Sequence, residues 1–385
     1  MPTGTLFQTT GRIIRGAGCL ARVAEEVKRL RKKKVMIVTD PGIVATGMIA
    51  RLVELLEKAE IAVMIFDAIE PDPRLQIAGL AAEQLRATGS ELVIGIGGGS
   101  AIDIAKVAAI LVTNEGSIGT FFGIDLVPRP GLPLIVIPTT AGTGSEVTPI
   151  AILSDEEEKL KKGIVSPYLF PTVALLDPEL TVGLPPRVTA ATGMDALIHA
   201  MEAYTSKNAD PLTDLLACQA MKLLYGSIRK AFNDGTDIEA RSNMLEGSML
   251  AGMAFANAGV TAVHAFAYPI GAEFHIPHGI ANSMMLIPVM EFNMVARPER
   301  FAAIAAIFGQ DITGRAPEAG AALAIETIRS LSVDLALPKK LSEYGVKKED
   351  IDNLAAGVMK VTRLLANNPR ELTLNDARDI YLKVL

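Results

Sequence analysis

The stretch ELVIGIGGGSAID, residues 91–103, joins an apolar strand through a glycine-rich turn to the start of a helix. Glycines at such a turn let the backbone approach a pyrophosphate, and the helix N-terminus offers N–H donors at the positive end of its dipole. The spacing departs from the strict G-x-G-x-x-G, so a tight turn that only packs the helix on the strand is the alternative. We predict a phosphate-binding turn here.

Around this turn, short β-branched runs alternate with amphipathic helical segments through the first half of the chain. Predicted strands lie at residues 34–40, 61–67, 91–97, 132–138 and 172–177, and predicted helices at 19–33, 49–59, 76–88 and 101–112. Continuous apolar strands separated by helices indicate a parallel sheet that is covered on both faces.

The composition changes at GLPPRVTAA, residues 183–191, where a helix is expected to start at Thr189 or Thr192. Beyond residue 190 the β-branched runs disappear and helical periodicity dominates. A chain of 385 residues is long enough to bury two cores. We therefore predict an α/β domain at residues 1–183 and an all-helical domain at 184–385.

All four histidines lie within the predicted helical domain, between residues 193 and 279. In TGMDALIHAMEAY, Asp195 precedes His199 by four residues, which on a helix places carboxylate and imidazole on one face. His264 lies in TAVHAFAYPIG, and HIPHG contains His275 and His278.

An aspartate beside an apolar helix needs a partner, and one carboxylate with several imidazoles suits a divalent transition metal. We predict as metal ligands Asp195, His199, His264 and His278, with His275 nearby. The alternative for each histidine is a core residue that is hydrogen-bonded to the backbone.

Three features of the first domain point to a dinucleotide. Asp40 ends the first predicted strand, where a carboxylate could accept both ribose hydroxyls and repel a 2′-phosphate, which favours NAD over NADP. A turn or helix cap before Pro41 is the competing role for Asp40. The loop PTTAGTGSEVTP, residues 138–149, offers hydroxyls and amides, and a lysine of the charged turn at 159–162, otherwise a solvated hairpin, could reach a phosphate.

Composition excludes several classes of protein. The net charge is −6, and no run of Lys and Arg is interleaved with aromatics, so no nucleic-acid partner is expected. Two distant cysteines form no disulfide framework, and the first residues contain no apolar signal-peptide region. The apolar run at 249–274 is broken by polar residues and is expected to be one buried helix, not a membrane span. We expect a soluble, cytoplasmic protein.

Together, the motifs GGGSAID, PTTAGTGSEVT, ATGMDALIHAMEAY, HAFAYPIG, HIPHGIAN and NNPRELT resemble the iron-containing (group III) alcohol dehydrogenase family, in order and over nearly the whole chain. The resemblance implies a Rossmann-like domain that binds NAD, with NADP less favoured, and a helical domain that holds a divalent metal. It implies hydride transfer between nicotinamide and a small neutral primary alcohol, diol or aldehyde. One carboxylate and three imidazoles suit Fe(II) better than Zn(II), although zinc could occupy the same site.

The resemblance also assigns residues. The metal ligands of the family fall on Asp195, His199, His264 and His278. Its cofactor-binding positions fall on Asp40 for the ribose, Gly97, Gly98, Ser100 and Asp103 at the turn and helix start, Thr139, Thr140, Thr143 and Thr148 in the threonine loop, and Lys162. The residues expected to line an apolar substrate pocket are Ile150, Phe255 and Leu364.

One position departs from the family pattern. Some members carry a further histidine four residues after the third ligand, where it takes part in proton movement, and here that position is Tyr268. His275 could serve as the proton relay instead, or ribose hydroxyls and water could carry the proton. Family members commonly pair through the N-terminal strand, so a homodimer through residues 6–10 is expected.

Two other classes compete with a dehydrogenase. A lyase that resembles dehydroquinate synthase, or a reductase that resembles maleylacetate reductase, would act on an anion and need a Lys/Arg-lined pocket. Residues 193–279 contain few basic side chains, namely Lys207, Lys222, Arg229, Lys230 and Arg241, which favours a neutral substrate. The remaining alternative is a catalytically silent NAD-binding protein.

Overall fold

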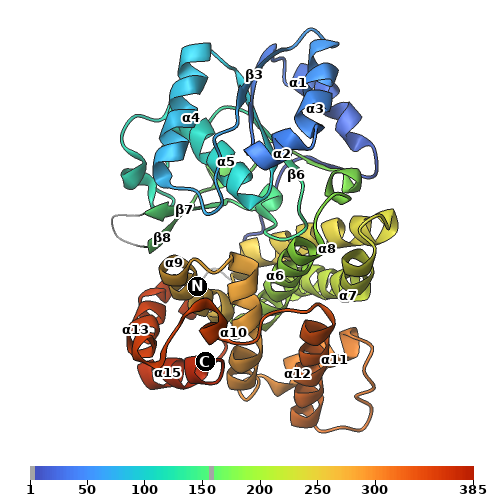
Figure 1. Ribbon diagram of the computed structural model, residues 1–385, viewed down its shortest axis with the longest axis vertical. Coiled ribbons are helices and arrows are strands. Elements are labelled where there is room, and N and C mark those ends of the chain that lie inside the picture. The colour runs from blue at the N-terminus through green and yellow to red at the C-terminus, as the bar shows by residue number, and fades with distance from the viewer. Residues whose placement is uncertain (1–4, 156–159) are drawn as a thin grey trace. The chain divides into compact units, whose positions relative to one another are not determined.

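The computed structural model describes residues 5–155 and 160–385, drawn in Figure 1. The chain divides into two compact units, Met1–Gly183 and Leu184–Leu385.

A six-stranded parallel sheet forms the first unit, with the strand order β1-β9-β6-β4-β2-β3. Its strands are β1 (Ile13–Arg15), β2 (Lys34–Val38), β3 (Ala62–Phe66), β4 (Leu92–Gly97), β6 (Leu134–Pro138) and β9 (Val173–Leu176). All five predicted strands are present, so the parallel α/β architecture is confirmed. The edge strand β1 was not predicted, because three residues are too few to show a periodic pattern.

Helices cover both faces of this sheet (Figure 1). They are α1 (Val23–Arg29), α2 (Pro41–Ala45), α3 (Met48–Glu57), α4 (Leu75–Thr88) and α5 (Gly99–Thr113). The helix predicted at 19–33 is shorter than expected: it opens as a 3₁₀ turn at Cys19–Arg22 and closes before Arg31, whose φ is 58°. The consecutive basic side chains after Arg29 extend the helical pattern in the sequence but not the helix itself.

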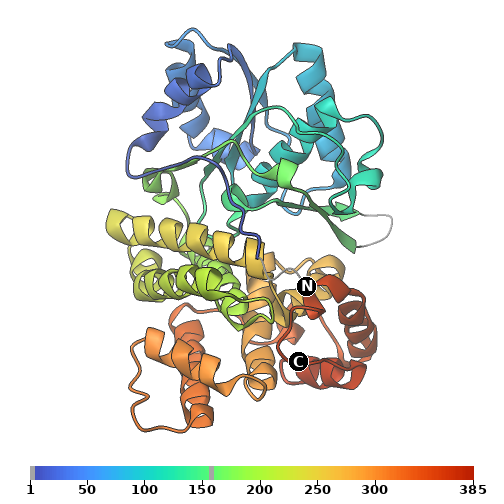
Figure 2. The same ribbon diagram turned by 180° about the vertical axis from the view of Figure 1, so that it is seen from behind.

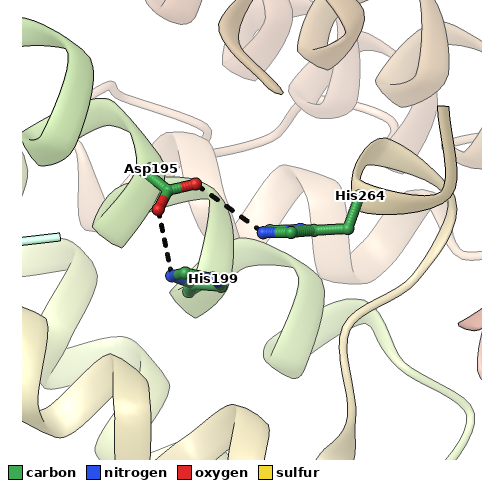
Figure 3. A group of neighbouring side chains, drawn as sticks. All are labelled: Asp195, His199 and His264. Atoms are coloured by element: carbon green, nitrogen blue, oxygen red, sulfur yellow. Dashed lines mark ion pairs between the residues drawn. The ribbon is translucent and has the colours of Figure 1, made fainter. Parts of the chain in front are cut away.

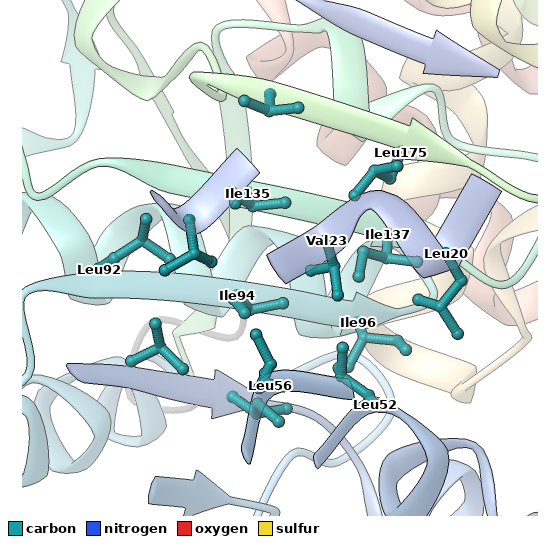
Figure 4. Close-up of a cluster of buried hydrophobic side chains, with 14 of the residues drawn as sticks. Leu20, Val23, Leu52, Leu56, Leu92, Ile94, Ile96, Ile135, Ile137 and Leu175 are labelled. Atoms are coloured by element: carbon teal, nitrogen blue, oxygen red, sulfur yellow. The ribbon is translucent and has the colours of Figure 1, made fainter. Parts of the chain in front are cut away.

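Strand β4 packs differently on its two faces. On one face Ile94 and Ile96 are fully buried against side chains of α1 and α3, including Val23 and Leu56 (Figure 4). On the other face a Cβ at Gly95 would lie 2.8 Å from the Cβ of Ala105, so this glycine lets α5 approach the strand. Part of the glycine-rich pattern therefore serves packing of α5 on the sheet.

A second, smaller sheet was missed by the sequence analysis. Strand β8 (Leu160–Val165) pairs antiparallel with β7 (Ile150–Asp155) and parallel with the short β5 (Gly123–Ile124). The charged turn predicted at 159–162 falls partly in β8, and Lys159 lies outside the described residues. Two lysines in succession obscure the alternating pattern of β8 in the sequence.

The second unit is entirely helical, as predicted. Its helices are α6 (Pro186–Thr205), α7 (Pro211–Asn233), α8 (Ile238–Ala258), α9 (Ala262–Phe274), α10 (His278–Asn293), α11 (Pro298–Ile307), α12 (Pro317–Asp334), α13 (Ile351–Lys360), α14 (Thr362–Leu365) and α15 (Leu374–Leu382). Helices α7 and α8 lie side by side, as Figure 2 shows from behind. The helix expected from Thr189 or Thr192 begins earlier, at Pro186, because proline is tolerated in a first helical turn.

The apolar run at 249–274 is not one helix, which corrects the prediction. Helices α8 and α9 meet at a bend of 102°, where Gly259 has φ 80° and the Asn367 amide donates to the carbonyl of Val260. Within the described residues, no single helix is both long and apolar enough for a membrane span, and only this bent pair meets those two criteria when its members are combined.

Helix α10 begins in close contact with α6. A Cβ at Gly279 would overlap the carbonyl oxygen of Ala191 and lie 2.8 Å from its carbonyl carbon. The glycine therefore permits the backbone approach that fixes His278, its neighbour, beside α6.

We expect Gly279→Ala to lower the free energy of unfolding by about 1–3 kcal/mol, because the added methyl forces α10 away from α6. Urea denaturation measures this change. Gly226→Ala, in α7, is the matched control, because no described atom lies within 4 Å of the added methyl. The control should stabilise the protein by about 0.5–1 kcal/mol through helix propensity. Equal effects of the two variants would contradict the close approach.

Candidate functional site

Helix α6 carries three ionisable side chains on one face of an otherwise apolar helix. Asp195, His199 and Glu202 follow one another at spacings of four and three residues, and each is at most 5% exposed. The sequence analysis found the first two and missed Glu202, although its spacing from His199 is the signal that could have revealed it.

Two further helices bring imidazoles to Asp195. His264, on α9, places Nε2 3.6 Å from Asp195 Oδ1, and Figure 3 shows its ring directed at that carboxylate. His199 Nδ1 lies 4.0 Å from Asp195 Oδ2. His278, the first residue of α10, places Nε2 3.7 Å from Asp195 Oδ1. The structure therefore gathers the three predicted histidine ligands around the fourth predicted ligand, Asp195.

Glu202 binds the ring nitrogen of His264 that does not face Asp195. Its Oε2 is hydrogen-bonded to His264 Nδ1, and its Oε1 accepts from the Thr261 hydroxyl at 2.6 Å and from the Val263 amide at 2.7 Å. The carboxylate thus satisfies an amide in the first turn of α9 while it fixes which nitrogen of His264 faces Asp195.

The carboxylates and imidazoles of the cluster stabilise one another's charged forms. Burial would raise the pKa of Asp195, but His199, His278 and His264 outweigh this effect and hold that pKa well below its usual range. For His264 burial acts against the protonated ring, yet Glu202 and Asp195 raise its pKa to about 9. Burial likewise opposes the charge on Glu202, but His264 and the hydrogen bonds it accepts lower its pKa.

Asn282 is a second residue that the sequence analysis missed. It lies one turn after His278 on α10, is fully buried, and donates from Nδ2 to Asp195 Oδ1 at 2.7 Å. The same Nδ2 is 3.2 Å from His278 Nε2. The amide thus orients the carboxylate, and its spacing from His278 matches the spacing of His199 from Asp195.

Aromatic rings enclose the cluster. His199 stacks between Phe255, with ring centroids 4.3 Å apart, and His264, at 4.5 Å. Phe255, predicted as a pocket residue, therefore lies against a predicted metal ligand.

This arrangement fits a divalent metal. The donor atoms of Asp195, His199 and His264 lie within 4.8 Å of one another, and His278 adjoins them as a fourth side chain. His264 Nε2 is buried, and among residues 5–155 and 160–385 it has no hydrogen-bond partner. Imidazole nitrogens with a carboxylate oxygen suit Fe(II) or Zn(II).

The other predicted residues of this unit differ in burial and in their distance from the cluster. Tyr268 lies one turn after His264 on α9, with its ring centroid 6.2 Å from that of His278. His275 is exposed and ends α9 in the left-handed conformation, with φ 53°. Leu364 is fully buried in α14, which packs on α9. Tyr268, at the position where some family members carry the further histidine, therefore lies beside the cluster, whereas His275, the predicted relay, is exposed.

In the first unit, the predicted cofactor residues meet at the carboxyl ends of neighbouring parallel strands. The Gly97 carbonyl at the end of β4 accepts from the Thr139 amide after β6, at 3.0 Å. A Cβ at Gly99 would lie 2.7 Å from the Thr143 side chain, and one at Gly98 would lie 3.7 Å from Thr140 Oγ1. The glycine turn and the threonine loop are thus packed together at one edge of the sheet.

Asp40 lies at the same edge, after β2. Its Oδ1 accepts from the Ile43 amide at 3.0 Å and caps α2, which was the competing interpretation. Its Oδ2 faces the glycine turn, since a Cβ at Gly97 would lie 3.3 Å from it. The cap uses one oxygen and leaves the other beside the turn.

The N-terminus of α5 begins at the glycine turn, with Gly98 as its N-cap residue. No described side chain caps this helix of 15 residues, whose first turn contains Ser100. Asp103, four residues into α5, accepts from the Ser145 hydroxyl at 2.6 Å and from the Ile152 amide at 2.9 Å. It therefore joins α5 to the loop and to β7.

A buried lysine connects α5 to the threonine loop and was missed by the sequence analysis. Lys106 Nζ donates to the carbonyls of Thr148 and Ile150, each at 2.8 Å, and lies 3.2 Å from Thr148 Oγ1. Burial lowers the pKa of Lys106 to about 8 and raises that of nearby Glu146 to about 7. The signal in the sequence was a lysine within the apolar run AIDIAKVAAILV.

Lys162 lies in β8, where Nζ is 2.8 Å from Asp155 Oδ2 and 5.5 Å from the centroid of the Phe122 ring. Ile150 begins β7 and is partly buried.

Comparison with known proteins gives two family matches that together span most of the chain. Residues 10–178 match the iron-containing alcohol dehydrogenases, and residues 189–385 match the C-terminal domain of the Fe-containing alcohol dehydrogenase family.

Individual relatives are similar along their full length. A sulfoacetaldehyde reductase of Bilophila wadsworthia (strain 3_1_6) is 43% identical over 364 residues, which cover 94% of each chain. The crystal structure of a 1,3-propanediol oxidoreductase superposes with a TM-score of 0.97 at 37% identity, covering 99% of this chain and 100% of that one. A sulfoacetaldehyde reductase from Bifidobacterium kashiwanohense in complex with NAD⁺ gives a TM-score of 0.90 at 31% identity, covering 99% of each chain.

The buried pair in the first unit predicts a pH dependence of stability. Burial raises the pKa of Glu146 in the folded protein above its pKa in the unfolded chain. The stability contributed by this side chain is therefore fully present when the pH is below the pKa of the unfolded chain, and it is lost as the pH rises towards 7. We expect Glu146→Gln to gain stability relative to wild type between pH 5 and pH 8, on the order of 2 kcal/mol. Urea denaturation at several pH values measures the difference.

The exposed Glu115→Gln is the control, and its difference from wild type should stay flat over the same range. A flat difference for Glu146→Gln would show that this carboxyl is not perturbed by burial.

Proposed function

The chain belongs to the iron-containing alcohol dehydrogenase family, and on that basis we propose that it catalyses reversible hydride transfer between small neutral primary alcohols or diols and NAD. The convergence of Asp195, His199 and His264, with a buried His264 Nε2 that has no hydrogen-bond partner among the described residues, carries this proposal. Nothing in the site or in these relatives favours the lyase alternative.

The metal would be held by the four side chains predicted from the sequence, Asp195, His199, His264 and His278, with Fe(II) favoured and Zn(II) as the alternative. A divalent metal there supplies Lewis acidity towards an alcohol or carbonyl oxygen. Glu202 keeps His264 Nε2 directed into the site, and Asn282 keeps the Asp195 carboxylate in place. These two residues position the ligands before anything binds.

The surroundings of the cluster favour an uncharged substrate. The side chains found against its members, Phe255, Thr261, Tyr268 and Asn282, carry no positive charge. Phe255 covers one face of the His199 ring and keeps water from it. We propose that the Tyr268 hydroxyl exchanges the substrate proton with solvent, since His275 is exposed at the end of α9. Phe255 would contribute to an apolar pocket together with Leu364.

We propose that NAD binds along the carboxyl edge of the sheet and supplies the hydride acceptor. The uncapped N-terminus of α5, with Gly97, Gly98 and Ser100, suits a pyrophosphate, and Asp103 fixes that helix on its neighbours. Thr139, Thr140, Thr143 and Thr148 line the adjoining loop, and Lys162 is the candidate cation nearby. The Oδ2 atom of Asp40 would accept the ribose hydroxyls, which favours NAD over NADP.

We also propose a homodimer in a reducing, cytoplasmic compartment. Leu6, in the predicted pairing segment 6–10, is 76% exposed, and β1 lies at one end of the strand order of the described residues, so a second copy could pair there. Cys19 and Cys218 are both free thiols. Light scattering checks the dimer, and cell fractionation checks the location.

Removal of the metal tests the function. After dialysis against a chelator, we expect NADH formation with 1-butanol or 1,2-propanediol to fall at least about 100-fold and to return on addition of Fe(II) or Zn(II). Full activity of the stripped protein would contradict the metal requirement. His275→Asn is the control variant for the histidines and should retain activity.

A comparison of aldehydes tests the substrate class. A higher kcat/KM for sulfoacetaldehyde than for neutral aldehydes would contradict a neutral substrate.

Asp40 sets the cofactor preference. We expect Asp40→Asn, which keeps an oxygen to cap α2 but removes the charge, to raise the ratio of kcat/KM for NADP to that for NAD at least about tenfold. Asp40→Gly should do the same at some cost in stability, since the cap is lost. Asp40→Glu, which keeps the charge, is the control. An unchanged ratio in Asp40→Asn would mean that this carboxylate does not face the ribose.

A further inference from the structure

Helix α10 has a second face that the proposed chemistry does not use. His278 and Asn282 point to Asp195, whereas Met284, Ile287 and Glu291 lie on the opposite side of the helix and line a cavity of about 310 Å³. The cavity is closed by the end of α12 and by the segments around residues 337–340 and 383–384. Its volume is at the lower end of the range for small-molecule sites.

The floor of this cavity is apolar. Met284 and Leu337 are 4% and 6% exposed, and Ile287 and Pro288 lie beside them. Pro288 has no N–H, so the Met284 carbonyl lacks its usual helical donor one turn later. A short hydrocarbon chain suits such a floor.

Among the residues that line the cavity, the four cations Arg329, Lys339, Lys340 and Lys383 outnumber the one carboxylate, Glu291. Two further carboxylates adjoin the rim: Glu326 pairs with Arg329 at 3.2 Å, and Glu343 accepts from the amides of Lys339 and Lys340 at 3.3 and 3.1 Å. This local excess is opposite in sign to the net charge of the chain, −6. Glu291 bridges two of the cations, with Oε1 3.2 Å from Arg329 and Oε2 2.9 Å from Lys383. Lys339 and Lys340 form no ion pair with any residue that the structure describes.

We propose that this cavity, separate from the candidate metal centre, binds a small amphipathic organic anion. The acidic group lies between Lys339 and Lys340 at the rim, and the apolar chain lies on the floor formed by α10 and Leu337. Glu291 competes with the bound anion for Arg329 and Lys383. The proposal does not depend on the metal or on NAD, because every residue in it lies on the far face of α10 or beyond.

Isothermal titration calorimetry of the full-length protein with four probes tests whether binding needs both the acidic group and the apolar chain. Octanoate and hexyl phosphate carry charge and chain, inorganic phosphate carries charge alone, and octanamide carries the chain alone. We expect the first two to bind at least about tenfold more tightly than the last two, with affinity that falls as salt concentration rises. Chelator-treated protein should bind them equally well, which separates this site from the metal centre. Failure of octanoate and hexyl phosphate to bind, or equal binding of octanamide, would overturn the proposal.

Two variants that should change the affinity for octanoate in opposite directions locate the site. Lys339→Ala with Lys340→Ala should weaken octanoate binding at least about tenfold, whereas Lys347→Ala with Lys348→Ala, a pair outside the cavity, should leave it unchanged. Glu291→Gln should tighten binding several-fold, because it releases Lys383 from its internal partner and removes one of the two carboxylates paired with Arg329, the other being Glu326. Damage to the fold would weaken binding in both cases, so tighter binding by Glu291→Gln cannot arise from it. Wild-type affinity in the Lys339/Lys340 variant, or no gain in Glu291→Gln, would overturn the assignment.

Discussion

The buried carboxylate of Asp195 is the constraint on which the helical unit depends. An isolated charge in such surroundings is strongly destabilising, so helices α6, α9 and α10 must deliver polar partners to it. They deliver three imidazoles at 3.6–4.0 Å and the amide of Asn282 at 2.7 Å. Because imidazoles are also donors that suit a divalent metal, the groups that compensate the charge of Asp195 are the same groups that would hold the proposed metal. Glu202 repeats the principle one turn further along α6, where it serves His264 and the start of α9 together.

Close backbone approach makes this convergence possible. The contact between Gly279 and Ala191 fixes where α10 begins, and His278 and Asn282 follow from that point. In the α/β unit, glycines act in the same way: Gly95 admits α5 to the sheet, and Gly99 admits the Thr143 side chain to the turn. In both units, the absence of a Cβ at a few positions brings the polar side chains of separate elements within reach.

Local signals in the sequence predicted most of the architecture. The five longer strands of the six-stranded sheet, the helical second half and the pairing of Asp195 with His199 follow from periodicity and spacing, which depend on neighbours only a few residues apart. Short or interrupted elements were not recoverable in this way. Strand β1 is too short to show a pattern, and the bend between α8 and α9 depends on the Asn367 side chain from a distant segment.

The sequence by itself determined which residues could bind a metal and which stretch could bind a phosphate, because residue type and local spacing carry that information. Only the tertiary structure decided which other side chains hold those residues in position. Glu202, Asn282 and Lys106 gain their roles from contacts with residues 42 to 87 positions away in the chain. It also decided that Tyr268 lies near His278 while His275 faces solvent. Such choices depend on how helices pack, and packing is set by the summed contacts of many residues, not by any single motif.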